Sequence, residues 1–176
     1  MAIESRVARV VAIGALVVGT LDILDALVFW AVRGVPPYRV LQGIASGLLG
    51  RSSFAGGAST ALLGLALHFF IATCVVLVYF AAARRVPSLH RAPFLWGPLY
   101  GVAVFLFMYF VVIPLSAMTR RLITVPVAVN GILIHILGVG IPAALAARAA
   151  IRARSVAAPP AASNPSGAPL PPGAPH

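Results

Sequence analysis

Long apolar runs alternate with short polar and basic segments along this chain. A helix needs about 20 apolar residues to cross the hydrocarbon core of a bilayer. Four runs meet this length, at residues 9–31, 58–82, 93–115 and 122–147. Arginine, glycine or proline lies near the ends of each run, as expected where helices leave the membrane. The pattern predicts an all-α membrane protein, built as a bundle of four transmembrane helices.

The connection from residue 33 to residue 57 is the only long one. After Pro36 and Pro37, apolar residues recur at helical spacing within residues 38–49. They are Val40, Leu41, Ile44, Ala45, Leu48 and Leu49. This spacing predicts a short amphipathic helix that lies in the outer interface of the membrane. The alternative is an irregular loop that caps the bundle.

The two ends of the chain differ in character. The first apolar run is too long for the apolar region of a cleaved signal peptide, so we expect it to be retained as a helix. Residues 155–176 consist mainly of Pro, Ala, Ser and Gly without periodicity. This composition predicts a disordered cytoplasmic tail. Residues 1–154 are then the membrane domain.

The composition also indicates that the apolar surface of this protein faces a lipid bilayer. Apolar residues make up 61% of the chain and charged residues 9%, whereas soluble domains have about a quarter charged residues. All 13 basic residues are arginine. They lie between the apolar runs and form no basic stripe with interleaved aromatic residues, so no nucleic-acid binding is expected.

The arginines also predict the orientation in the membrane, because cytoplasmic loops carry an excess of basic residues. With the N-terminus inside, the inner arginines are Arg6, Arg9, Arg84, Arg85, Arg91, Arg148, Arg152 and Arg154. The outer arginines are Arg33, Arg39, Arg51, Arg120 and Arg121. The excess predicts a multi-pass protein of a bacterial inner membrane with both termini in the cytoplasm.

Four ionisable residues lie inside the predicted membrane helices: Asp22, Asp25, His68 and His135. Such residues are costly in lipid and usually face the protein interior. Asp22 and Asp25 are three residues apart and share one helix face. Each of the four lies on a stripe of Gly and Ala, where helices approach closely. We therefore expect one polar layer, with Asn130 either bonded to His135 or part of a polar interface.

Several functions fit this polar layer. It could bind or pass protons or a cation, or it could only hold the bundle together by hydrogen bonds between helices. His68 and His135 could also ligate a metal ion or a haem iron. No cofactor is assigned on this basis. An enzyme is not expected, because the sequence has no recognisable nucleophile–base pair or phosphate-binding loop. Four helices are few for a self-contained transporter, so a homo-oligomer or a membrane-protein partner is expected.

Several landmarks between residues 10 and 150 suggest a relationship. They are Pro36, Pro37, Tyr38, Gly64, His68, Tyr79, Gly101, Leu106, Phe107, Pro114, Leu115, Thr119, His135 and Arg148. In this pattern the chain resembles the YagU-like family of small, uncharacterised bacterial inner-membrane proteins. Gly131 and Ile132 stand where that family pattern favours an acidic residue near the histidine. The resemblance implies a four-helix inner-membrane protein and no particular chemistry.

Overall fold

The computed structural model describes residues 2–119 and 122–156, and within these residues every regular element is a helix. The α-helices are α1 (Ala2–Ala31), α2 (Pro37–Leu49), α3 (Gly57–Arg85), α4 (Pro87–Arg91), α5 (Pro93–Phe107), α6 (Ile113–Leu115), α7 (Val125–Ile134) and α8 (Ile141–Val156). A 3₁₀-helix, η1 (Gly50–Ala55), follows α2. Two π-helices are η2 (Met108–Val112) and η3 (His135–Gly140). Residues 157–176 of the predicted tail lie outside the described residues.

In the part of the chain that the structure describes, four continuous helical segments are long and apolar enough to cross a membrane. They are Glu4–Ala31, Gly57–Arg85, Pro93–Leu115 and Val125–Arg154. Each exposes large apolar side chains, for example Leu16, Phe70, Phe94 and Leu133. Such apolar surfaces are stable in lipid, and the backbone N–H and C=O groups are satisfied there by hydrogen bonds within each helix. The predicted class, an all-α bundle of four membrane helices, is confirmed. The fourth segment begins at Val125, three residues later than predicted.

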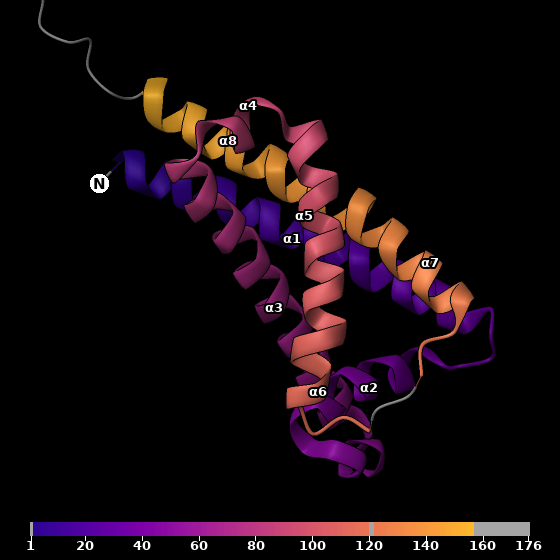
Figure 1. Ribbon diagram of the computed structural model, residues 1–176. Helices are drawn as coiled ribbons and strands as arrows, with labels where there is room; N and C mark the ends of the chain where they lie inside the picture. Colours follow the sequence, from indigo (N-terminus) through magenta and orange to yellow (C-terminus); the bar gives the residue numbers. More distant parts are fainter. Residues whose placement is uncertain (1, 120–121, 157–176) are drawn as a thin grey trace, which may run out of the picture.

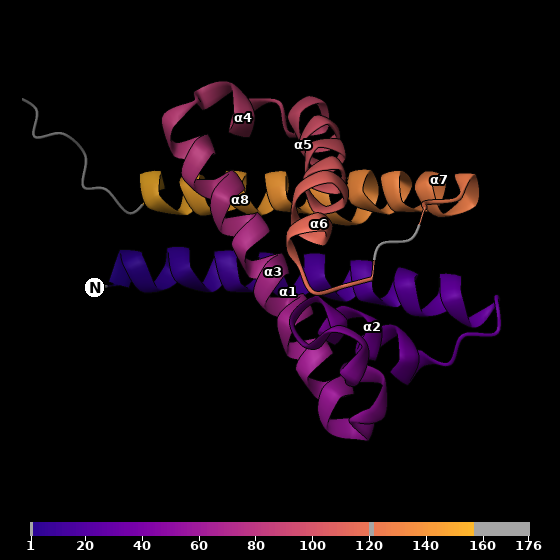
Figure 2. The ribbon, with the colours of Figure 1, turned by 60° about the horizontal axis from the view of Figure 1, so that its bottom comes forward.

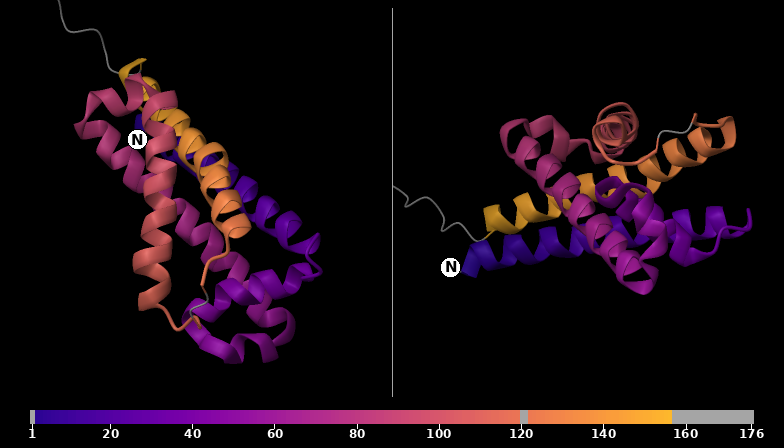
Figure 3. Two further views of the ribbon diagram at one scale, coloured as in Figure 1. Left: turned by 45° about the vertical axis from the view of Figure 1, so that its right-hand side comes forward. Right: turned by 90° about the horizontal axis from the view of Figure 1, so that it is seen from below.

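The first and last segments form the long axis of the molecule. α1 runs antiparallel to α7, η3 and α8, and the two lie side by side (Figures 1 and 2). α3 and α5 cross this pair obliquely (Figure 3). The N-terminus, α4 and the last turn of α8 lie at one end, and α2, η1 and α6 lie at the other (Figure 1). Consecutive spans therefore alternate in direction.

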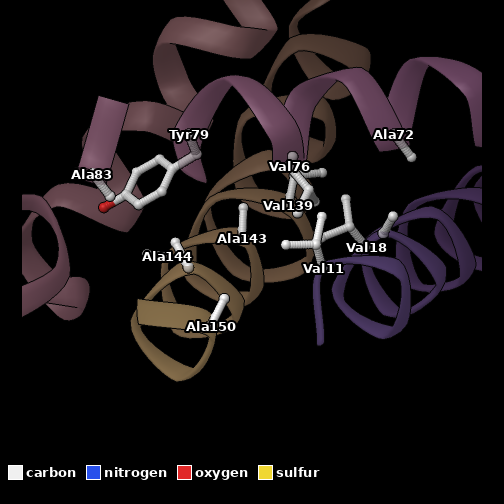
Figure 4. Close-up of a cluster of buried hydrophobic side chains, with 12 residues drawn as sticks. Val11, Val18, Ala72, Val76, Tyr79, Ala83, Val139, Ala143, Ala144 and Ala150 are labelled. Carbon is white, nitrogen blue, oxygen red and sulfur yellow. The ribbon is translucent and has the colours of Figure 1, made fainter. Parts of the chain in front are cut away.

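The core lies where α1, α3 and α8 meet, and its side chains are small. Val11 and Val18 of α1 face Val76 of α3 and Val139 of η3 (Figure 4). α8 contributes a fully buried alanine row, made up of Ala143, Ala144, Ala147 and Ala150. Small side chains let helix backbones approach closely, which is how helices associate in lipid. The helices are therefore densely packed toward the end that holds the start of α1 and the last turn of α8.

Two glycines of α5 bring its backbone directly onto the fourth span. A methyl group added at Gly97 would lie 2.9 Å from the Cα atom of Ile141. A methyl group at Gly101 would collide with the carbonyl of His135, and one at Gly140 with the carbonyl of Gly97. The Gly97-x-x-x-Gly101 pair therefore packs against another helix of the same chain. This contact places His135 against α5.

Both π-helices end two residues before a proline. η2 ends at Val112 before Pro114, and η3 ends at Gly140 before Pro142. A proline ring clashes with the carbonyl four residues earlier and lacks an N–H to bond it. The wider π-turn absorbs this clash, because the Ile113 N–H bonds the carbonyl of Met108 and the Ile141 N–H bonds that of Ile136. Pro142 thus sets the register in which η3 presents His135.

The predicted amphipathic helix is present as α2, and its polar side packs against the protein. Gln42 is 1% exposed, and its side-chain amide nitrogen Nε2 donates to the carbonyl of Gly57 at 2.9 Å. Arg39 donates in turn to Gln42 Oε1 and to the carbonyl of Phe54. Leu48 and Leu49 remain exposed. Close contact at Gly64, where a methyl group would meet the Leu41 carbonyl, fixes α2 on α3.

The α5 contact gives a direct test. Gly101→Ala should lower the stability of the bundle by about 1–3 kcal/mol, because the new methyl group overpacks against the His135 carbonyl. Thermal unfolding in detergent, followed by circular dichroism, measures the change. Gly43→Ala is the matched control, because nothing lies within 4 Å of a methyl group there. Equal stability of the two variants would contradict the close contact between α5 and η3.

Candidate functional site

Asp22 of α1 lies between two histidines that come from different helices. Its Oδ2 atom is 4.0 Å from Nδ1 of His68 on α3. Its Oδ1 atom is 4.0 Å from Nδ1 of His135, the first residue of η3. The side chain of Asp22 is 26% exposed, that of His68 12% and that of His135 18%. Three of the predicted site residues are therefore brought together.

The ring of His68 is oriented by the backbone of α1. Its Nε2 atom lies 2.8 Å from the carbonyl oxygen of Gly19. A carbonyl oxygen can only accept, so Nε2 carries the proton and donates this bond. When the ring is neutral, Nδ1 is then a bare acceptor, and it faces the Asp22 carboxylate. Two acceptors that face each other repel unless a proton lies on one of them.

His135 has the opposite arrangement of its ring nitrogens. Its Nδ1 atom lies 2.8 Å from the carbonyl oxygen of Gly131, one turn earlier, and must donate to it. The neutral ring therefore has its bare acceptor at Nε2. Phe105 of α5 packs edge-on against the ring at 5.5 Å between centroids. Gly131 leaves room for Phe105, because a methyl group there would press on the phenyl ring.

Asp25 has a different partner. The amide Nδ2 of Asn130 on α7 donates to Asp25 Oδ2 at 2.7 Å. Asn130 was expected beside His135 or at a polar interface; its bond goes to Asp25, and the ring of His135 bonds the Gly131 carbonyl. Asp25 lies one turn farther along α1 than Asp22 and makes no ion pair with either histidine among the described residues. The two aspartates therefore differ in role.

The charge of Asp22 has few sources of compensation. Within residues 2–119 and 122–156, the two histidine contacts are the only ion pairs, and no arginine approaches a carboxylate. An isolated carboxylate at this depth of a membrane is costly. A proton shared among Asp22, His68 and His135 removes that cost, because it makes the group neutral overall. The arrangement is suited chemically to holding one exchangeable proton.

The same residues were candidates for a metal site. In the part of the chain that the structure describes, no group of three or more His, Cys, Asp or Glu side chains could hold a metal ion. Each imidazole already uses one nitrogen to bond a backbone carbonyl. His68 and His135 therefore have one free nitrogen each, and both rings approach the same carboxylate.

Three partners of this site were missed by sequence reasoning: the carbonyls of Gly19 and Gly131, and the ring of Phe105. The spacing of Gly131 and His135 by four residues could have indicated their bond, because such residues are neighbours on a helix. The bond to Gly19 depends on how α1 and α3 pack, for which the sequence has no local signal.

The four spanning segments define the class of this chain as a multi-pass integral membrane protein. The chain matches no family model, no curated protein and no solved structure. Its function is therefore argued from the geometry of the site.

The two histidines should have different tautomers. In ¹⁵N spectra of histidine-labelled protein in bilayers, at a pH where both rings are neutral, His68 should carry its proton at Nε2 and His135 at Nδ1. The reason is that each proton must lie toward a backbone carbonyl. His68→Gln and His135→Gln variants assign the signals. A proton at Nε2 of His135 would contradict the bond to Gly131.

Proposed function

We propose that this membrane protein binds an exchangeable proton at Asp22 and passes it between His135 and His68. The proposal also includes a small cation that binds and passes at the same residues in place of the proton. The observation that carries it is the position of one carboxylate between two imidazoles, with each of its oxygens 4.0 Å from a ring nitrogen. The mechanism involves no covalent chemistry on a substrate.

Each step of such a transfer has a donor and an acceptor. A proton that arrives at Nε2 of His135 makes the ring an imidazolium. The ring then breaks the bond from Nδ1–H to the Gly131 carbonyl and releases this Nδ1 proton to Oδ1 of Asp22, which leaves a neutral ring with its proton at Nε2. Asp22 is then a neutral carboxylic acid, and rotation of its carboxyl group turns the same proton toward the bare Nδ1 of His68, which accepts it and becomes an imidazolium while Asp22 returns to a carboxylate. The distances of 4.0 Å must shorten to about 2.8 Å, or one water must bridge them.

A structural role is the second candidate, and specific bonds favour it. His68 ties α3 to the Gly19 carbonyl of α1, and Asn130 ties α7 to Asp25 of the same helix. Bonds between membrane helices contribute about 0.6 kcal/mol each on average. In this case the polar layer stabilises the bundle and moves nothing. The transfer role and the structural role predict different effects when Asp22 alone is replaced: loss of flux in the first case and loss of stability in the second.

We also propose that the protein lies in a bacterial inner membrane with both termini in the cytoplasm. The arginine distribution supports this, because the end that holds the start of α1, α4 and the last turn of α8 also holds eight arginines: Arg6, Arg9, Arg84, Arg85, Arg91, Arg148, Arg152 and Arg154. A relationship to the YagU-like family would agree with it. Function as a homo-oligomer or with a membrane-protein partner is part of the proposal, because four helices are few for transport.

Proton flux tests the proposal. In proteoliposomes, Asp22→Asn should lower the flux about 100-fold, because a positioned proton-transfer group contributes at least this much. Asp25→Asn is the matched control: it is the same substitution, one turn away, and its carboxylate bonds an amide instead of a histidine. It should keep most of the flux. A pH-sensitive dye inside the vesicles reports the rate under an imposed potential.

Two outcomes would contradict the transfer role. Equal loss of flux in both variants would show that Asp22 has no special part in it. Absence of flux in the wild type, with a loss of stability in Asp22→Asn, would favour the structural role. Circular dichroism and size-exclusion chromatography show that each variant is folded before its flux is compared.

Orientation is tested separately with reporter fusions. Green fluorescent protein fused after Arg154 should fluoresce, and alkaline phosphatase fused there should be inactive, because this position is predicted to be cytoplasmic. Alkaline phosphatase fused after Gly50 should be active. The reverse pattern would overturn the proposed orientation without affecting the geometry of the site.

A further inference from the structure

A basic cavity lies at the end of the molecule that holds the start of α1 and the last turn of α8, away from the aspartate and histidine layer. It measures about 290 Å³ and is lined by His90, Arg91, Arg148, Ile151 and Arg152. The first two residues belong to α4, the short helix between the second and third spans, and the others to α8. α4 packs beside α8 at this end (Figures 1 and 2).

Among the described residues, no acidic side chain forms an ion pair with the arginines of this cavity. Arg148 and Arg152 are four residues apart on α8, where like charges repel. The whole sequence has three acidic side chains, Glu4, Asp22 and Asp25. Among the described residues, none of the three makes an ion pair with an arginine. The cavity therefore collects three positive charges that an anion from outside the chain would neutralise.

The position of the cavity indicates the kind of anion. The second span ends at Arg85 and the third begins at Pro93, so α4 lies at the depth where a spanning helix leaves the hydrocarbon. Lipid phosphates lie at this depth, and guanidinium groups bind phosphate with paired hydrogen bonds. His90 is held at the cavity by a bond from its Nδ1 to the carbonyl of Ala83 at 3.1 Å.

A neighbouring hollow favours a lipid over free phosphate. Leu89, the residue before His90, lines a second cavity of about 230 Å³. Its other lining residues are mostly apolar or aromatic: Tyr79, Ala82, Trp96, Leu99, Tyr100 and Ala103. We propose that the basic cavity binds the phosphate of an anionic phospholipid, whose acyl chains remain at the apolar surface of the bundle. This proposal is independent of proton transfer at Asp22.

Binding of phosphatidylglycerol to the full chain in detergent tests the proposal, with phosphatidylcholine and inorganic phosphate as the comparison ligands. Native mass spectrometry measures the affinity. Arg148→Gln/Arg152→Gln should weaken phosphatidylglycerol binding roughly 30-fold, since each arginine near anionic lipid contributes about fivefold. Arg33→Gln/Arg51→Gln removes the same charge at the opposite end and should change the affinity little. Arg152→Gln alone, at an exposed position, replaces the double variant if that one fails to fold.

Each result bears on the proposal. Selective loss in the Arg148 and Arg152 variant supports a lipid site in this cavity. Equal loss in both double variants means attraction by overall charge and overturns it. Inorganic phosphate that competes at the concentration of the lipid would make soluble phosphate the occupant, which also overturns it. Equal binding of phosphatidylcholine and phosphatidylglycerol would exclude recognition of the anionic headgroup.

Discussion

The close approach of helix backbones at glycine and alanine is the contact on which the rest of the structure depends. Between membrane helices there is little hydrophobic driving force, so packing and interhelical hydrogen bonds hold them together. Gly97 and Gly101 bring α5 onto η3, and the alanines of α8 bring it onto α1. His135 lies at the first of these contacts, because its own carbonyl meets Gly101.

This packing also decides the electrostatics. Small residues allow α1, α3 and η3 to converge, and the convergence places Asp22 within 4.0 Å of a nitrogen of each histidine. The carboxylate then has only imidazoles for compensation among the described residues. A π-turn imposed by Pro142 presents His135, as often occurs where a helix carries function. The aspartate and histidine layer and the basic cavity at one end are thus features of the same helix arrangement.

The sequence predicted the fold class, because apolar length and arginine spacing are local signals. It also placed Asp22, His68 and His135 in one layer, since depth follows from the rise of about 1.5 Å per residue. The partners within the layer depend on helix rotation and crossing, which have no local signal. For this reason the sequence left Asn130 either bonded to His135 or at a polar interface, and the structure shows its bond to Asp25. The two π-helices were not predicted from the sequence; they lie before Pro114 and Pro142.

The most direct test of the central claim is a double-mutant cycle between Asp22→Asn and His68→Gln, with a second cycle between Asp22→Asn and His135→Gln. Unfolding free energies in bicelles give the coupling between each pair. If Asp22 shares a proton with both rings, each cycle should give a coupling of about 0.6–1.7 kcal/mol, and Asp25→Asn with His68→Gln should give none. Additive effects in both Asp22 cycles would contradict the claim that this carboxylate links the two histidines.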